Sequence, residues 1–191
     1  MAIELLILLI IIFVIFIAVT LNANAPNDEK HYKEIMKLWQ QHFIYTVLVT
    51  KATLDDDPNL DLLLNKLIKN QKDIGIVFKK KYGKTVGNVV TLKLVEHVTI
   101  VSKILKAVEN KNAEGSDLII KLNSNAYEIG DYLDNLFKTN IYKYHFRVHV
   151  ASLVNYVTSY AQVHNDYYYL DEYLNPGMLM AIDMGKNIYF S

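Results

Sequence analysis

A unit of two expected helices recurs three times in this 191-residue chain, and that recurrence constrains the fold more than any other feature. Each copy places a histidine on its first helix and an acid, an aliphatic residue and a glycine on its second. The three pairs are His42 with Asp73, His97 with Glu128, and His149 with Asp183. Each histidine precedes its acid by 31, 31 and 34 residues, and successive acids are 55 residues apart. A helical hairpin repeated three times predicts an all-α, six-helix bundle.

Turn-forming residues divide the chain into an apolar segment, a linker and one bundle. We expect a transmembrane anchor over residues 1–22, a linker over 23–26 and the bundle over 27–191. Strand-type alternation is weak throughout the bundle. Pro176 is expected to kink or split the last helix. The predicted hairpins occupy residues 27–82, 84–137 and 140–190.

The apolar segment predicts an uncleaved single-pass membrane helix. The run from Leu5 to Leu21 is interrupted only by Thr20, and about 20 apolar residues suffice to cross a bilayer. A removed secretory signal is the alternative, because Ala23-Asn24-Ala25 resembles a cleavage site. No lysine or arginine precedes the run, however, and Pro26 directly follows the triplet. We therefore expect contact with a membrane through residues 3–21.

The distribution of lysines around this segment predicts its orientation. None precedes it, whereas Lys30, Lys33 and Lys37 follow it closely. The positive-inside rule then places the bulk of the chain on the cytoplasmic or interior side of the membrane.

Composition excludes several classes of function. The formal net charge is zero, and only Arg147 among the 20 basic residues is an arginine, so we expect no nucleic-acid partner. The absence of cysteine excludes disulfides, thiolate metal sites and cysteine nucleophiles. Abundant lysine, isoleucine, asparagine and tyrosine suggest an AT-rich coding genome, which large DNA viruses, low-GC bacteria and some protists share.

The repeated polar residues are expected to form one layer in each hairpin. His42, His97 and His149 each lie in the middle of an apolar helical stripe. Folding each hairpin about its turn brings the histidine level with its acid. Asn70 and Asn125 lie on the inward stripes of the second helices and support the layer. The remaining histidines, which lack repeated partners, are expected at the surface: His31, His145 and His164.

Three interpretations of this layer stay open. In the first, each hairpin buries a structural histidine–carboxylate pair, and the glycine after the acid permits close helix approach. In the second, the layers converge, and His42, Asp73, His97, Glu128, His149 and Asp183 bind Fe, Mn or Zn. The Glu-x-x-His spacing of known helical metal sites is absent. In the third, the hairpins enclose a small apolar ligand. No catalytic motif is found, so no reaction and no other cofactor are predicted.

Several segments resemble a family of small uncharacterised helical proteins of bacilli and related bacteria. Members carry a Leu-Trp-x-x-His helix, a Leu-x-x-Asn-x-x-Asp-Ile-Gly segment, a Tyr-Gly turn and a Leu-x-x-His helix. The resemblance covers about residues 37–188, and it implies a helical fold with a polar layer but no activity. The chain departs from the pattern at Asn175, where members often carry a histidine, and in its N-terminal anchor. The matching segments are 38–42, 67–75, 82–83, 94–97 and 125–129.

The sequence therefore predicts a membrane-anchored helical protein with a structural or interaction role and with protein partners. Its composition and anchor suit a membrane component of a large DNA virus particle. The alternative is a metal-binding helical bundle that uses the repeated histidines and carboxylates. The sequence identifies neither the partner nor the oligomeric state.

Overall fold

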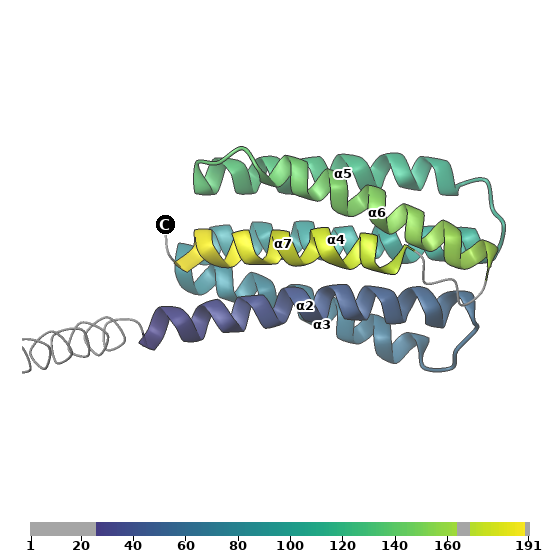
Figure 1. Ribbon diagram of the computed structural model, residues 1–191, viewed down its shortest axis with the longest axis horizontal. Helices are drawn as coiled ribbons and strands as arrows, with labels where there is room; N and C mark the ends of the chain where they lie inside the picture. The colour runs from purple at the N-terminus through teal and green to yellow at the C-terminus, as the bar shows by residue number, and fades with distance from the viewer. Residues whose placement is uncertain (1–25, 164–168, 190–191) are drawn as a thin grey trace, which may run out of the picture.

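The computed structural model describes residues 26–163 and 169–189, and these residues form six α-helices. Successive helices run antiparallel as three hairpins (Figure 1), so the predicted all-α bundle is confirmed. The predicted anchor and most of the linker lie outside the described residues. No helix among the described residues is long and apolar enough to cross a membrane. The helices are α2 (Pro26–Leu54), α3 (Leu60–Tyr82), α4 (Lys84–Glu109), α5 (Gly115–Phe137), α6 (Tyr142–Gln162) and α7 (Leu170–Tyr189).

The last helix, α7, packs against the first helix, α2, and so completes the bundle. In the view of Figure 1, α5 and α6 lie on one side, α2 and α3 on the other, and α7 runs beside α2. The helices pack around one continuous apolar core, because each buries one stripe of aliphatic and aromatic side chains. Among its largest members are Trp39, Phe43, Phe78 and Phe146.

Short connections fix the helices within a hairpin and between successive hairpins. A single residue, Gly83, joins α3 to α4 with φ of 89°, a left-handed conformation that glycine adopts without strain. Between α2 and α3, the side chain of Asp57 accepts a hydrogen bond from the backbone of Asn59 (2.7 Å). Before α6, the buried carboxylate of Asp134 accepts bonds from the backbone N–H groups of Tyr142 and Lys143 (2.9 and 3.1 Å). These two groups have no partner within their own helix, so α5 fixes the start of α6.

Pro176 lies inside α7 without dividing it. The helix is continuous from Leu170 to Tyr189, so Pro176 does not split it, and the alternative of a kink stays a prediction. Proline removes the hydrogen bond that would reach the carbonyl of Glu172. Glu172 lies exposed in the first turn of the helix, where water can bond that carbonyl instead.

The glycine that follows each repeated acid lies where two helices touch. A Cβ on Gly130 would be 2.7 Å from the Cα of Lys143 in α6, and one on Gly185 would be 2.6 Å from the ring of Tyr32 in α2. A Cβ on Gly75 would overlap the side chain of Thr91 in α4. The predicted packing role of these glycines is confirmed.

Replacing Gly130 by alanine tests this close approach. The added methyl group would meet the backbone of α6, which cannot rotate away, so we expect Gly130→Ala to lower the free energy of unfolding by about 1–3 kcal/mol. Gly115→Ala is the matched control, because its Cβ would have only Ala107 at 4.0 Å. Urea unfolding measures both variants, and equal stability of the two would contradict the packing role.

Candidate functional site

The three repeated histidines meet at the centre of the bundle. His42 of α2, His97 of α4 and His149 of α6 are 3%, 2% and 1% exposed. The ring centroid of His149 lies 5.7 Å from that of His42 and 5.8 Å from that of His97. Because α2, α4 and α6 each open a hairpin, equivalent positions of the repeat lie at the same depth. We call these three side chains the imidazole cluster.

Aromatic rings enclose the imidazole cluster. Phe43 packs edge-on against both His42 and His149, with centroid distances of 5.1 and 5.4 Å. The ring of Tyr173 lies 5.4 Å from His149, and Phe146 lies 6.3 Å from His97. Such a lining excludes water and leaves little to solvate a positive charge.

This burial keeps the imidazoles neutral. It lowers the pKa of His42 to about 3, with a further contribution from repulsion by His97. It lowers the pKa of His97 to about 4, against a smaller upward effect of the Asn125 hydrogen bond. The pKa of His149 falls well below its usual range, first through burial and then through repulsion by the other two rings. At neutral pH the imidazole cluster therefore carries no charge.

Amide side chains, rather than acids, bond the first two histidines. The side-chain NH₂ group of Gln71 donates to Nδ1 of His42 (3.0 Å), and Nδ1 of His97 donates to the carbonyl oxygen of Asn125 (2.8 Å). The amide groups of Asn70 and Asn125 also donate across the hairpin, to the backbone carbonyls of Leu38 and Lys93. Those two carbonyls lie four residues before the respective histidine, so the contact repeats with the sequence. Asn125 contacts its repeated histidine directly, whereas Asn70 contacts Gln71, which bonds His42.

The third hairpin lacks this amide. Met180 lies 55 residues after Asn125, at the equivalent position, and it is fully buried. Nδ1 of His149 has no hydrogen-bond partner among the described residues, and neither has Nε2 of His97. Two buried imidazole nitrogens are therefore left unsatisfied, which is unusual because buried polar atoms are nearly always paired.

The three repeated acids lie at the solvent-accessible edge of the hairpins. Their side chains are 33%, 56% and 34% exposed for Asp73, Glu128 and Asp183. Each has another partner instead of the repeated histidine: Lys69 for Asp73, Lys93 for Glu128 (2.9 Å) and His145 for Asp183 (3.0 Å). The predicted buried histidine–acid pairs are therefore wrong. Pairing at the edge of the bundle avoids the energetic cost of burying a charged carboxylate.

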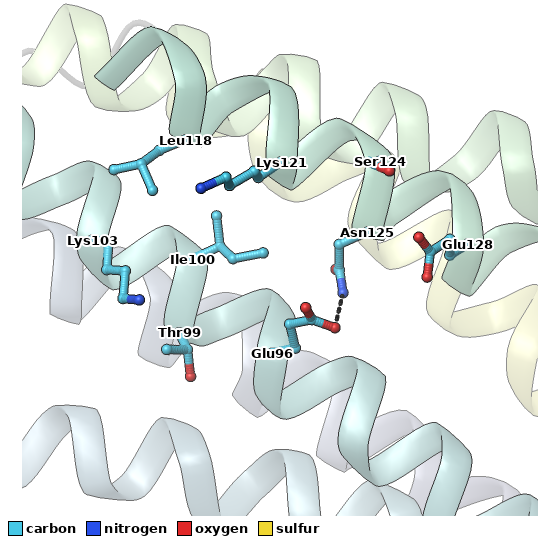
Figure 2. Close-up of a pocket in the computed structure, with 9 residues that line it drawn as sticks. All are labelled: Glu96, Thr99, Ile100, Lys103, Leu118, Lys121, Ser124, Asn125 and Glu128. Atoms are coloured by element: carbon cyan, nitrogen blue, oxygen red, sulfur yellow. Dashed lines mark hydrogen bonds between the residues drawn. The ribbon is translucent and has the colours of Figure 1, made fainter. Parts of the chain in front are cut away.

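Figure 2 shows how this edge looks between α4 and α5. Asn125 points toward α4 and donates a hydrogen bond to Glu96 (3.2 Å), whereas Glu128 lies farther along α5. Asn125 thereby links a surface groove of about 410 Å³ to the buried ring of His97. Asn125 is thus the polar side chain that lies between this groove and the imidazole cluster.

A six-residue metal site does not form in this arrangement. The acids and the imidazoles are not brought together, and no group of three or more His, Asp or Glu side chains within residues 26–163 and 169–189 is placed to hold a metal ion. The imidazole nitrogens remain the atoms with which a buried ligand could interact.

Two of the other histidines differ in their surroundings. His31 is partly exposed and stacks on Tyr189 with a centroid distance of 5.5 Å. His145 has a side chain that is only 15% exposed and bonds Asp183, so its predicted surface position is wrong. It lies one turn before His149, where the helical period already indicates an edge between core and solvent. His164 lies outside the described residues.

The pH dependence of stability tests the neutrality of the imidazole cluster. Because the folded pKa values lie below the unfolded value of about 6.5, the unfolded chain binds more protons as the pH falls. Stability is therefore highest above about pH 6.5, and it declines until the folded pKa values are reached. At pH 5 we expect His42 and His97 each to contribute a loss of about 2 kcal/mol, and His149 to contribute a further loss in the same direction. Urea unfolding at several pH values measures the loss, and a flat profile between about pH 7.5 and 5 would contradict it.

Comparison with known proteins shows no relative. No protein-family model matches the chain, and neither a curated protein nor a solved structure is significantly similar to it.

Proposed function

We propose that this protein is a membrane-tethered helical scaffold whose bundle presents contact surfaces to protein partners. The observation that supports this function is the short distance along the chain between the apolar run and the bundle. The run ends at Leu21 and α2 begins at Pro26, which leaves residues 22–25 between them. An extended residue spans at most about 3.6 Å, so the tether is shorter than about 15 Å. The bundle is thus held at the bilayer.

The bundle surface offers several separate apolar contacts. Leu92, Ile120 and Leu179 are 71%, 68% and 60% exposed, and they lie on three different helices. Ile44 and Leu48 lie one turn apart on the outer side of α2 and are 50% and 39% exposed. Singly exposed apolar side chains are common on protein surfaces, so these positions do not by themselves identify one partner interface.

The setting that we propose is the membrane of a large DNA virus particle, with the bundle on the cytoplasmic or interior side. Two features of the sequence support this setting. Lysine greatly outnumbers arginine, as in an AT-rich genome, and lysines follow the apolar run whereas none precedes it.

Extraction of membranes with alkaline carbonate tests the tether. We expect the full chain to remain in the membrane pellet. A charge in the centre of a spanning helix costs about 2.5–3.5 kcal/mol, so Ile12→Asp/Phe16→Asp is expected to release the protein. The matched control Ile12→Leu/Phe16→Leu is expected to stay in the pellet. Release of the unaltered chain by carbonate would contradict the tether.

Binding of a transition metal at the imidazole cluster is the second candidate function. The unpaired Nε2 of His97 and Nδ1 of His149 favour it, because neutral imidazole nitrogens are ligands for zinc, copper and iron. The two rings stack at 29° to each other, so they would need to turn before both nitrogens faced one ion.

Elemental analysis of the full chain, purified without chelator, separates this candidate from a purely structural cluster. Metal binding predicts about one equivalent of Zn, Cu or Fe, lost in His97→Gln and retained in the matched control His31→Gln. Absence of metal from the unaltered protein would rule the candidate out and leave the three imidazoles as part of the core.

A further inference from the structure

The fold gathers lysines at the end of the bundle where α2 begins. Because the helices alternate in direction, α3, α5 and α7 end there, and α4 and α6 begin there. Figure 1 shows the start of α2 (purple) and the end of α7 (yellow) at this same end. We call the lysines around it the basic end. They are Lys79, Lys80, Lys81, Lys84, Lys138 and Lys186. The acids whose side chains the structure describes at this end pair with neighbours in the fold or cap α6, and they are Glu29, Glu34, Asp131, Asp134 and Asp183.

The opposite end of the bundle is acidic. The turns from α2 to α3 and from α4 to α5, together with the start of α7, carry many more acids than lysines. The net charge of zero therefore conceals a molecule with oppositely charged ends. The acids are Asp55, Asp56, Asp57, Asp61, Glu109, Glu114, Asp117, Asp171 and Glu172.

The charges at the α3–α4 turn are exposed and little neutralised. Lys80 has Glu34 as an ion-pair partner at 3.9 Å, and Lys81 lies over the ring of Tyr189 at 5.3 Å. Lys79 and Lys84 form no ion pair with any residue that the structure describes. Four like charges within six residues repel one another unless an external anion offsets them.

Helix capping explains only part of this cluster. Lys79, Lys80 and Lys81 end α3, where cations stabilise the helix dipole. Lys84 instead begins α4, which has no acid in its first turn, and a cation is unfavourable at that terminus. The position of Lys84 therefore has no stabilising explanation within the bundle.

We propose that the basic end rests on an anionic lipid surface, formed by the headgroups of the bilayer to which the chain is tethered. This inference rests on the proposed function, because the tether brings the bilayer to this end. Residues 22–25 are too few to let the bundle move far from the headgroups, and the α3–α4 turn lies at the same end as the first turns of α2, where Lys80 pairs with Glu34. Each lysine near an anionic surface strengthens the attachment about fivefold.

The half-buried rings of Tyr82 and Tyr189 lie at the same end. Tyrosine is enriched where apolar and aqueous surroundings meet at a membrane. The acidic end faces away from the lipid, which keeps its carboxylates clear of the anionic headgroups. The bundle is thereby oriented upright, with its free end toward partners.

The chain lacks cysteine, so a single introduced cysteine can carry a probe of lipid contact in the full-length protein. Thr85→Cys labels the basic end and Ala113→Cys the acidic end, and both positions are exposed. Each labelled chain carries an environment-sensitive fluorophore and is reconstituted into phosphatidylcholine vesicles, with or without phosphatidylserine. With phosphatidylserine, we expect the Thr85 probe to shift to the blue and to be quenched by spin-labelled headgroups. High salt should remove both effects, and the Ala113 probe should show neither.

Removing the charges tests the assignment to particular lysines. Lys79→Gln/Lys80→Gln/Lys81→Gln/Lys84→Gln should weaken the contact of the Thr85 probe at least a hundredfold. The matched control Lys66→Gln/Lys72→Gln/Lys103→Gln/Lys106→Gln loses the same charge from exposed positions elsewhere and should retain the contact.

The possible outcomes distinguish the two proposals. A chain that does not float with either kind of vesicle overturns the proposed tether. A chain that floats, with a Thr85 probe indifferent to phosphatidylserine, overturns the upright contact and leaves the tether intact. Equal effects of the two quadruple variants, or equal responses of the two probes, also overturn the contact.

Discussion

Three neutral imidazoles held together away from water are the constraint on which the rest of this bundle depends. Each hairpin contributes one of them at the same depth, so the hairpins must pack in register for the rings to meet. Protonation of any ring would place a charge among Phe43, Phe146 and Tyr173, and no acid within residues 26–163 and 169–189 raises the pKa of these rings. The imidazole cluster therefore couples the packing of the hairpins to the protonation state of the core.

Neutral partners suit neutral rings. Gln71 and Asn125 supply a donor and an acceptor to His42 and His97 without bringing a second charge into the core. Asp73, Glu128 and Asp183 are left to pair at the edges of the helices, where solvent shares the cost of keeping them charged. The repeat thus carries two separate layers, an amide–imidazole layer inside and an ion-pair layer outside.

The periodicity of the sequence predicts the helices, the inward position of the repeated histidines and the bridging amides. It does not separate Asn70 from Asp73, since the two lie three residues apart and both fall near the same face of α3. Burial decides between them, and only the packed neighbours determine it. Folding the first hairpin about its turn places Gln71 opposite His42, so this contact could have been predicted. The other two hairpins carry no equivalent glutamine that would have drawn attention to it.

Other features depend on the relative placement of distant segments. The hydrogen bond between His145 and Asp183 joins residues 38 apart in the sequence, and the pattern of polar and apolar residues along either helix does not predict it. The segregation of charge is likewise invisible along the chain, where lysines and acids alternate in blocks. It emerges once alternating helix directions bring Lys79, Lys84, Lys138 and Lys186 to one end. The proposed role at a membrane joins that end to the apolar run before α2.

Long-range proton–nitrogen NMR of the imidazole rings in the full chain measures the central claim directly. The chain has six histidines, and three of them are expected to keep the nitrogen shifts of neutral tautomers down to the pH at which the bundle unfolds. His97 is expected to carry its proton on Nδ1, because the carbonyl oxygen of Asn125 accepts from it while the Asn125 amide donates to Lys93 and Glu96. Protonation of His42, His97 or His149 near pH 6.5 in the folded protein would contradict the account.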